Sequence, residues 1–453
     1  MAEVVVVGAG LGGLAAAARL AKLGHRVTVC ERRDVAGGAI HEVRHEGFSW
    51  DAGPASTTLP AVLRDLFRKS GRPIERYVDL VARDVVRRHV FADGTSVDLP
   101  AGSRARQTAA VDTGLGAGLG ERWTAHVDAQ AAVWDELRAR VLDLPDGGAA
   151  YSERAVASSL RARTSLAKLL RRSFKDERLR LLASYPFTVG GSDPRDVPAY
   201  AAVESYVERS FGVWEVSDGF FRVVDALVTR LGERGVVLRL GTEVTSIETD
   251  ESSSATVTGV RTAAGEGLSA DVVVTDVDPR IVFGRLLLDP AATGDAHRIF
   301  GTATPTIPPA VTHVGIAAAP GVPSDLPSEV VLHGDPLLVL TTTGRAPQGH
   351  HAWTIQTRGA PGEDVLVALA RRGIDVRAHE VCRVERDAVA QLGETGGSAY
   401  GLAWAGHRSH ARRAALVHPL PGVYLVGAGV HPGPSVPYVG WGAAHVAERL
   451  GTA

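Results

Sequence analysis

Cysteine is scarce in this chain of 453 residues, which contains only Cys30 and Cys382. Two thiols cannot build a disulfide framework or a cysteine-rich zinc cluster, so the fold has to be stable without either. The scarcity is typical of a protein from a reducing compartment, and we expect a cytoplasmic location.

Long apolar runs are missing as well. No stretch reaches the ~20 apolar residues that span a bilayer. The apolar segment from Val4 to Leu20 contains four glycines and follows no basic residue, so it does not fit a signal peptide. We therefore expect a soluble protein, or one that is peripheral to the membrane.

Neither sign of charge is in excess, because 49 basic side chains are balanced by 51 acidic ones. A nucleic-acid binder normally has a strong basic excess, so we do not expect a nucleic acid as partner. Methionine occurs once, and the abundance of Ala, Gly, Arg and Val is typical of a GC-rich, bacterial genome. The length exceeds what one core usually organises, so two domains are expected.

The chain begins with a glycine-rich unit. A run of valines, Val4 to Val7, predicts a strand that is buried on both faces. The turn Gly8-Ala9-Gly10-Leu11-Gly12-Gly13 follows, then a helix over 12–23 and a strand over 26–30 that stops at Glu31. This order of strand, G-x-G-x-x-G turn, helix, strand and acid is typical of a dinucleotide site.

Each of these residues has a physical role. Gly8 permits the tight turn, Gly10 lets the backbone approach a pyrophosphate, and Gly13 lets the helix pack closely on the strand. The helix N-terminus offers N–H groups to the phosphates. Glu31 can accept hydrogen bonds from a ribose and would repel a 2′-phosphate, which disfavours NADP. The unit alone leaves NAD and FAD open.

Three further segments favour FAD. The pair Gly37-Gly38 lets the chain pass close to a pyrophosphate, and residues 47–54 predict a strand that ends in a Gly-Pro turn. Near the other end, residues 422–426 predict a strand and residues 427–429 a glycine turn. A last helix should begin around Ser435-Val436-Pro437 and run to about residue 450, and its N-terminus is another potential anion site.

Together these segments resemble the FAD-dependent phytoene desaturase family, within the wider group that includes amine oxidases and protoporphyrinogen oxidase. The most specific matches are VVVVGAGLGGLAAAARLAKLGHRVTVCER and VYLVGAGVHPGPSVP, near the two ends of the chain. The stretches GFSWDAGPASTTLP, GTEVTSI, ADVVVTDVDP and GGSAYGL support them.

The resemblance implies FAD as the cofactor and gives its contacts by position. Gly8, Gly10 and Gly13 would surround the FAD pyrophosphate, and Gly37 and Gly38 would lie on the same diphosphate. Glu31 would hold the adenosine ribose, and Val244 would contact the adenine. Gly427 and Ala428 would face the phosphates and the ribityl chain, and Val436 and Pro437 would lie at the isoalloxazine. Their neighbours Ala9, Leu11, Gly12, Arg32, Ala39, Gly53 and Pro54 complete the predicted cofactor-binding set.

Two departures from the family's pattern matter. An arginine often follows the Gly-Gly pair in this family, whereas Ala39 stands here, so a charge contact is missing unless Arg32 or Arg33 supplies it. The chain also looks short for a carotenoid desaturase, which bears on the substrate more than on the flavin.

Because the flavin-type segments lie at opposite ends, the FAD-binding domain must be discontinuous. A helix over 220–234 and strands over 236–240 and 271–275 are expected to return to it, with Ser252-Ser253-Ser254 in a surface hairpin loop. We predict an α/β fold with a Rossmann-like FAD-binding domain (residues 1–70, 216–283 and 420–453). A mixed α+β substrate domain with a helical cap would take residues 71–215 and 284–419.

The cap region has two helical patterns. Residues 121–142 predict one amphipathic helix, and residues 152–180 one or two more. The second stretch carries nine basic residues among its leucines. A basic amphipathic helix can lie on an anionic membrane, which would suit an apolar substrate stored there, or it can present a solvated face. Both alternatives stay open.

No acid or base stands out near the predicted isoalloxazine segment. The candidates are His431, which can move a proton near neutral pH or simply bond the backbone, and Tyr438 and Trp441, which can wall the ring or pack the helix. The pairs His350-His351 and His407/His410 have no carboxylate or cysteine at ligand spacing, so no metal is predicted.

We therefore predict an FAD-dependent oxidoreductase that dehydrogenates, saturates or oxidises an apolar, lipid-like or isoprenoid substrate. The substrate C–H would lie about 3–3.5 Å from the flavin N5, which takes the hydride. The helix start near Pro437 would stabilise charge at N1. Oxygen, a quinone or a second protein stays open as electron acceptor. The alternatives are an amine-oxidase-like flavoprotein and a non-enzymatic prenyl carrier like the Rab GDP-dissociation inhibitors.

Overall fold

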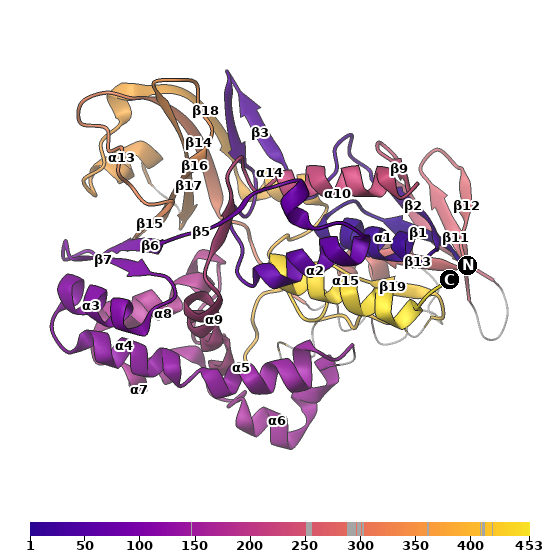
Figure 1. Ribbon diagram of the computed structural model, residues 1–453, viewed down its shortest axis with the longest axis horizontal. Helices are drawn as coiled ribbons and strands as arrows, with labels where there is room; N and C mark the ends of the chain where they lie inside the picture. The colour runs from indigo at the N-terminus through magenta and orange to yellow at the C-terminus, as the bar shows by residue number, and fades with distance from the viewer. Residues whose placement is uncertain are drawn as a thin grey trace.

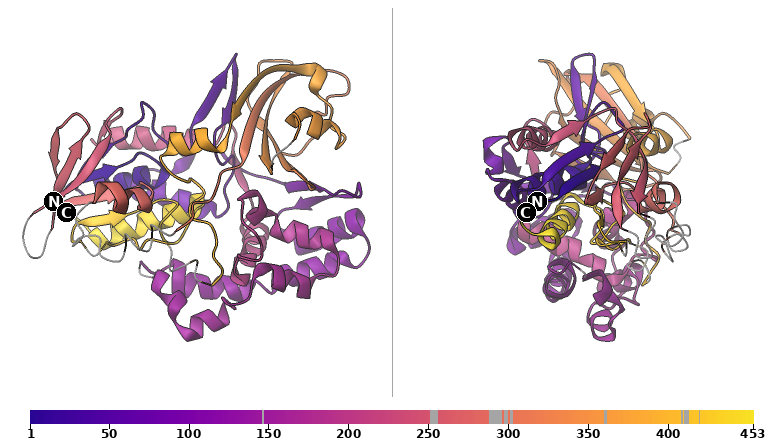
Figure 2. Two further views of the ribbon diagram at one scale, coloured as in Figure 1. Left: turned by 180° about the vertical axis from the view of Figure 1, so that it is seen from behind. Right: turned by 90° about the vertical axis from the view of Figure 1, so that its right-hand side faces the viewer.

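The computed structural model describes residues 1–145, 147–250, 256–287, 296, 300, 303–359, 362–407, 409, 413–418 and 420–453. Figure 1 shows three parts: a parallel sheet with its helices around the chain ends, a larger sheet (orange), and a helical region (purple). The termini lie side by side in both views of Figure 2, and the Ala453 amide donates to the Leu23 carbonyl at 3.0 Å.

The parallel sheet is assembled from three distant segments of the chain. Its central strand is the valine run, in which no residue from Val4 to Val7 is more than 4% exposed, as expected for a strand covered on both faces. The discontinuous Rossmann-like fold predicted from the sequence is thereby confirmed. In spatial order the strands are β19 (Val423–Leu425), β13 (Val272–Thr275), β1 (Glu3–Val7), β2 (Arg26–Cys30) and β9 (Val237–Arg239).

Helix α1 (Leu11–Lys22) is the centre of the helical packing around this sheet. It contacts three other helices, and Ala15 to Ala18 have no exposed area because their small side chains let these neighbours approach closely. The neighbours are α2 (Pro60–Ser70), α10 (Arg222–Glu233) and α15 (Val436–Leu450).

A small antiparallel sheet lies between β9 and β13 in the sequence, and it was not predicted as such. Its strands are β10 (Val244–Thr249), β11 (Val257–Thr262) and β12 (Gly267–Ser269). The predicted hairpin loop at Ser252-Ser253-Ser254 lies outside the described residues.

The larger sheet is mixed and has seven strands. Only the β6–β15 pair is parallel within the described ladder. In spatial order its strands are β18 (Glu380–Arg386), β14 (Ala310–Ala317), β17 (His350–Arg358), β16 (Leu337–Gly344), β15 (Glu329–Leu332), β6 (Val85–Val90) and β7 (Ser96–Pro100). Associated elements are the pairs β3 (Glu42–His45) with β4 (Phe48–Asp51) and β5 (Leu80–Ala82) with β8 (Trp214–Val216), and the helices α13 (Val365–Ala370) and α14 (Ala388–Thr395).

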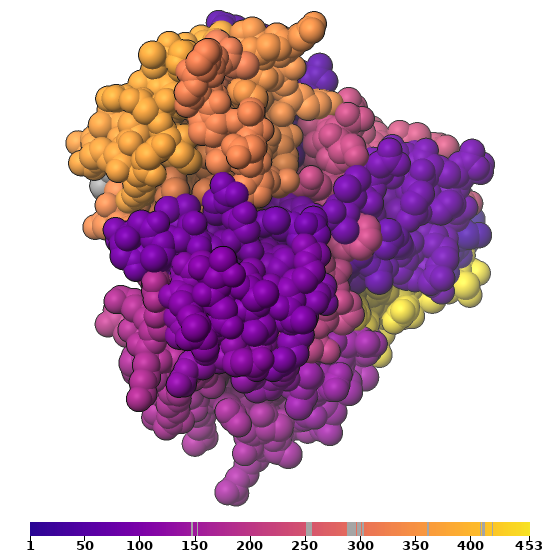
Figure 3. All heavy atoms as spheres, turned by 60° about the vertical axis from the view of Figure 1, so that its left-hand side comes forward, coloured from indigo at the N-terminus to yellow at the C-terminus, as the bar shows by residue number. Residues whose placement is uncertain are grey.

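The helical region forms a cap that lies against the larger sheet, as the space-filling view in Figure 3 shows. Its helices are α3 (Arg104–Leu115), α4 (Leu119–Asp128), α5 (Ala131–Leu137), α6 (Arg154–Ser159), α7 (Leu166–Ser173), α8 (Glu177–Val189) and α9 (Val203–Phe211). Short 3-10 or π-helical turns are η1 (Ile74–Arg76), η2 (Arg138–Leu142), η3 (Gly147–Ser152), η4 (Ala199–Ala202), η5 (Val282–Leu286) and η6 (Arg377–His379), and a single turn α11 spans Pro279–Ile281.

The prediction of one helix over residues 121–142 was wrong. The chain breaks after α4, where the Gln130 amide nitrogen Nε2 donates to the His126 carbonyl at 3.1 Å and the Gln130 backbone N–H bonds to the Val127 carbonyl. Such local bonds take up the free carbonyls at a helix end. Helix α5 then begins at Ala131.

Buried ion pairs join the cap to the larger sheet. Arg87 on β6 donates to Glu329 on β15 at 2.8 Å and to Glu208 on α9 at 2.9 Å. Tyr185 on α8 donates to Glu329 at 2.9 Å. Burial would raise the pKa of Glu329, but the charges of Arg87 and Arg83 lower it to about 2. These ion pairs therefore hold the cap against the larger sheet.

We expect Gly13→Ala to lower the free energy of unfolding by about 1–3 kcal/mol. A Cβ at Gly13 would overlap the Gly8 carbonyl oxygen, which is backbone and cannot turn aside. The change is measured by urea unfolding followed by circular dichroism. The control is Gly232→Ala in α10, where a Cβ meets nothing within 4 Å and should stabilise by about 0.5–1 kcal/mol. Equal effects of the two substitutions would contradict the packing argument.

Candidate active site

One cavity of about 580 Å³ connects the parallel sheet with the cap. At one end it is bordered by the glycine turns, and at the other by residues of the cap helices. The predicted cofactor residues that line it are Gly10, Leu11, Gly12, Gly37, Gly38, Ala39, Gly53, Pro54, Gly427, Ala428, Val436 and Pro437.

The glycine turns from both ends of the chain meet at this cavity. The Gly37 amide donates to the Ala9 carbonyl at 2.7 Å, and a Cβ on Gly38 would lie 3.2 Å from the Gly10 Cα. A Cβ on Gly12 would lie 3.0 Å from the Gly427 amide nitrogen. The missing side chains thus leave a cradle of backbone N–H groups, which suits a diphosphate.

Helix α1 adds the positive end of its dipole to this cradle. Its N-cap residue is Gly10, which has no side chain to accept the first free N–H groups. These donors are among the groups that a helix must satisfy from outside itself. An anionic phosphate at this point would satisfy them and would also interact favourably with the dipole.

Several predicted cofactor residues lie behind the cavity wall. The buried Glu31 accepts the Ala9 N–H with Oε2 at 2.8 Å and the Arg33 N–H with Oε1 at 2.9 Å, which leaves further lone pairs on both oxygens. Its carbonyl accepts the Thr242 N–H at 2.7 Å, two residues before Val244 at the start of β10. The predicted ribose and adenine contacts are therefore neighbours.

The predicted substitute for the missing arginine is not on the cavity wall. Arg32 is exposed and donates to the Glu394 carbonyl at 2.8 Å, while Arg33 donates to the Gly38 carbonyl at 3.2 Å. A cation does reach the wall from β18: Arg386 donates to the Ala52 carbonyl at 2.8 Å. The family's arginine after the Gly-Gly pair is a local sequence pattern. Such a pattern could not indicate an arginine on the distant strand β18.

Asp276 was missed by the sequence analysis, although it lies at the centre of the cradle. It follows β13 directly, and its Oδ2 accepts the Gly13 N–H at 3.0 Å. A Cβ on either Gly10 or Gly427 would overlap its carboxyl group. An acid at the carboxyl end of a buried parallel strand was the available signal, since ligands bind at that edge of such sheets.

The environment of Asp276 makes its charge costly. Burial is the main cause that raises its pKa to about 7, and the nearby Glu31 adds to the rise, against the hydrogen bonds from Gly13 and Gly12. The carboxyl group is therefore about half neutral at neutral pH.

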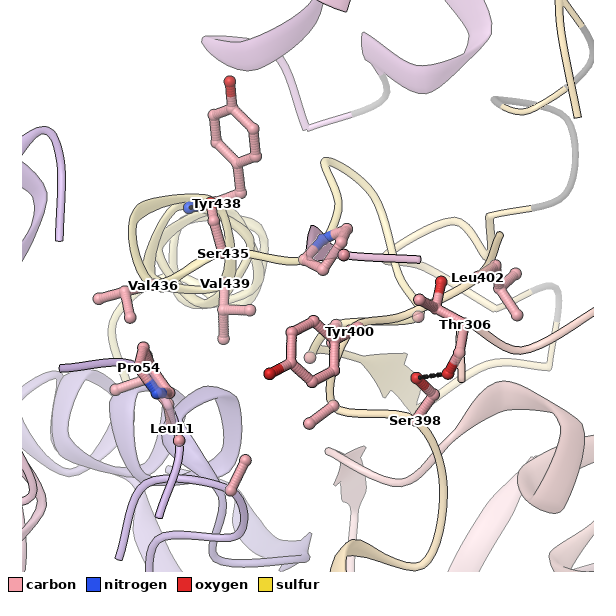
Figure 4. A pocket seen from close by; sticks show the side chains of 18 of the residues that line it. Leu11, Pro54, Thr306, Ser398, Tyr400, Leu402, Ser435, Val436, Tyr438 and Val439 are labelled. Atoms are coloured by element: carbon pink, nitrogen blue, oxygen red, sulfur yellow. Dashed lines mark hydrogen bonds between the residues drawn. The ribbon is translucent and has the colours of Figure 1, made fainter. Parts of the chain in front are cut away.

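The first turn of α15 forms another part of the wall. Ser435 caps it by accepting the Tyr438 N–H at 3.3 Å. Figure 4 shows Val439 on the side of the helix where Tyr400 lies and Val436 above Pro54, whereas Tyr438 points to the opposite side of the helix. The turn therefore presents an apolar surface to one part of the cavity and a phenol to another.

Of the three catalytic candidates, only Tyr438 lines this cavity. His431 is buried behind it, with its Nε2 3.2 Å from the Val141 carbonyl, and burial lowers its pKa to about 4. Its ring is thus neutral at physiological pH. Trp441 lies in a separate hollow beside α2 and α5.

No group of three or more His, Cys, Asp or Glu side chains in the described residues is arranged to hold a metal ion. Among the predicted pairs, His350 and His351 lie on β17. His410 lies outside the described residues.

The cap end of the cavity contains polar residues that the sequence did not reveal. Glu204 on α9 lines it, and the Tyr438 hydroxyl donates to its Oε1 at 3.4 Å. Burial, and then the neighbouring Glu208, raise the pKa of Glu204 to about 7. The other polar or aromatic side chains at this end are Tyr151, Tyr200, Trp404 and Arg413.

Comparison with known proteins assigns this arrangement to a family. The model of the family described as flavin containing amine oxidoreductase matches residues 11–305. Hydroxyneurosporene desaturase of Cereibacter sphaeroides is 30% identical, over 99% of this chain and 97% of that protein. The 4,4'-diapolycopene oxygenase of a Methylomonas species is 27% identical, over 99% of this chain and 98% of that protein. A solved structure of putrescine oxidase with bound putrescine has a TM-score of 0.73 at 15% identity, over 99% and 98% of the two chains.

The chain belongs to the flavin containing amine oxidoreductase family. It is an FAD-dependent oxidoreductase, and the predicted resemblance to phytoene desaturases is confirmed. The chain spans 97% of the length of the Cereibacter desaturase. None of its described helices is both long enough and apolar enough to cross a bilayer.

We expect the affinity for FAD to fall as the pH rises above about 7. Below that pH the Asp276 carboxyl is mostly protonated, whereas above it the carboxylate repels the diphosphate. The affinity should therefore fall by up to about tenfold for each pH unit above about 7. Asp276→Asn should bind FAD with little pH dependence and more tightly at alkaline pH. Flavin fluorescence quenching on titration of the apoprotein measures both.

The matched control is Asp218→Asn, which removes an exposed carboxylate that is not part of the cavity wall. It should retain the pH dependence of the unchanged protein. Parallel pH profiles for the unchanged protein and Asp276→Asn would rule out this role of Asp276.

Proposed function

We propose that this enzyme desaturates an apolar isoprenoid chain that lies in the cavity. The observation that carries the proposal is the continuity of the cavity from the glycine cradle to a wall of apolar cap side chains. This wall includes Leu137, Leu142, Phe187 and Val203. The names of the related desaturases support the same substrate class.

The chain supplies the parts of a flavin site along this cavity. We propose that backbone amides of Gly12, Gly38 and Gly427 hold the diphosphate, that Glu31 holds the ribose, and that the first turn of α15 lies beside the isoalloxazine. When bound, FAD supplies the two-electron acceptor that desaturation of a carbon–carbon single bond requires.

The protein's own contribution is orientation and the exclusion of water. Val436 and Val439 on one side and Tyr400 and Leu402 on the other line the middle of the cavity (Figure 4). An extended hydrocarbon has no polar group to direct it, so shape and burial have to place the reacting carbon atoms. The lining side chains serve that purpose.

The test uses the purified enzyme with FAD under anaerobic conditions. Phytoene supplied in liposomes should bleach the flavin absorption near ~450 nm and yield a polyene that absorbs at longer wavelength. Putrescine should leave the flavin oxidised. Bleaching by putrescine together with inertness toward phytoene and ζ-carotene would overturn the proposal in favour of an amine oxidase.

The same preparation identifies the electron acceptor. After reduction by substrate, the enzyme is mixed with oxygen-saturated buffer or with a soluble quinone, and the return of the flavin absorption is followed. Rapid recovery with the quinone alone indicates a membrane electron carrier, and rapid recovery with oxygen indicates an oxidase.

We also propose that the cap touches an anionic membrane through charge alone. Leu160, Leu166 and Leu170 are buried, so the apolar side of the basic stretch faces the cap interior. Its exposed cations are Arg154, Arg161, Arg163, Lys168, Arg171, Arg172 and Lys175. Such contact depends on surface electrostatics and is screened by salt.

Sedimentation with phosphatidylglycerol-containing vesicles tests this contact. The enzyme should pellet at low ionic strength and stay in the supernatant at about 0.5 M salt, where the Debye length is only a few ångströms. Arg171→Glu combined with Arg172→Glu should weaken pelleting. The proposal is wrong if pelleting is absent at low salt or survives high salt.

A further inference from the structure

The cap end of the cavity combines apolar walls with one carboxyl group. Glu204 lies on α9, and its Oε1 accepts the Tyr438 hydroxyl at 3.4 Å, which is a long and weak hydrogen bond. Tyr151 and Tyr200 also line this end, with ring centroids 5.4 Å apart. A polar group is thus held at the end of an otherwise hydrophobic site, as in pockets that orient a ligand.

Within the described residues this carboxyl group is not balanced by the protein. Glu204 has no ion pair there, and its Oε2 has no hydrogen bond to the protein. Arg87 on the sheet pairs with Glu208 instead. Because a half-buried carboxyl group without a matching charge is costly, a ligand group is the natural partner for it.

The protonation of Glu204 decides which ligand group fits. Its pKa of about 7, raised by burial and by Glu208, keeps a large fraction of the carboxyl group neutral in the cell. A neutral carboxyl group can donate one hydrogen bond and accept others, and so can the Tyr438 phenol. A hydroxyl group, which also donates and accepts, matches this pair.

A positive charge is already present at the cap end of the cavity. Arg413 lies over the Trp404 ring, 4.8 Å from its centroid, and donates to the Pro432 carbonyl at 2.6 Å. Burial raises the pKa of Tyr438 and Tyr200, and the charge of Arg413 opposes this rise, so its field reaches both phenols. A hydroxyl ligand adds no further charge to a site where this guanidinium already acts on the phenols.

We propose that Glu204 and Tyr438 bind a hydroxyl group at one end of the isoprenoid substrate. This rests on the proposed function and adds to it a substrate class, an isoprenoid alcohol. The polar end group fixes how far the chain enters the cavity, and it therefore selects which carbon atoms lie at the flavin.

The experiment compares three probes that share one isoprenoid skeleton: farnesol, the hydrocarbon farnesene and farnesylamine. Binding to the FAD-loaded enzyme is measured by quenching of tryptophan fluorescence, since Trp404 lines the cavity. Farnesol should bind about tenfold more tightly than farnesene, the effect of one good hydrogen bond, and also more tightly than farnesylamine.

Two variants of one residue separate hydrogen bonding from packing. Glu204→Leu should lower the affinity for farnesol about tenfold and leave farnesene unchanged. Glu204→Gln, which keeps a neutral donor and acceptor, should stay within about threefold of the unchanged enzyme for farnesol. Tyr438→Phe should lose part of the preference and serves if Glu204→Leu does not fold.

Tyr206→Phe is the matched control, because it removes a phenol from α9, the helix of Glu204, at a position outside the cavity wall. It should leave all three affinities unchanged. Equal affinities for farnesol and farnesene, or tighter binding of farnesylamine that Glu204→Leu abolishes, would overturn the inference. Reduction of the flavin by phytoene in the unchanged enzyme tests the proposed function separately. The proposed function and the hydroxyl-binding inference can therefore fail independently.

Discussion

The structure depends on the close approach of backbone segments that are far apart in the chain. Gly13 lies so close to Gly8 that a Cβ would overlap a carbonyl oxygen, and a Cβ on Gly12 would lie 3.0 Å from the Gly427 amide nitrogen. These contacts set the distance between α1 and the sheet and bring the last turn of the chain to the first. The cradle of N–H groups exists because both ends of the chain lack side chains at the same place.

Part of this could be predicted from the sequence and part could not. The valine strand, the glycine turns and the start of α15 at Val436 are local patterns of spacing, so the fold class and most of the cradle could be predicted. Asp276 and Arg386 enter the cavity only through strand pairing, and Glu204 only through the packing of the cap. For Asp276 the sequence offered one signal, its place directly after the predicted strand, whereas Arg386 and Glu204 have no local signal in a single sequence.

The break between α4 and α5 shows a second limit of prediction from the sequence. The amphipathic pattern of residues 121–142 continues through the break, because both helices bury their apolar sides in one core that includes Trp123 and Trp134. Hydrophobic periodicity reports which face is buried and not whether the axis is continuous. The break coincides with hydrogen bonds at Gln130, which periodicity does not record.

Burial raises the pKa of both Asp276 and Glu204, but the surroundings of these two carboxyl groups differ. Asp276 accepts backbone N–H groups at the start of α1, where an incoming diphosphate competes for the same donors. Glu204 lies one helical turn from Glu208, and residues at this spacing share a helix face. Glu208 is bound to Arg87 of the sheet, and this ion pair fixes the rotation of α9 about its axis. The ion pair that joins the cap to the sheet therefore also directs the unpaired carboxyl group of Glu204 into the cavity.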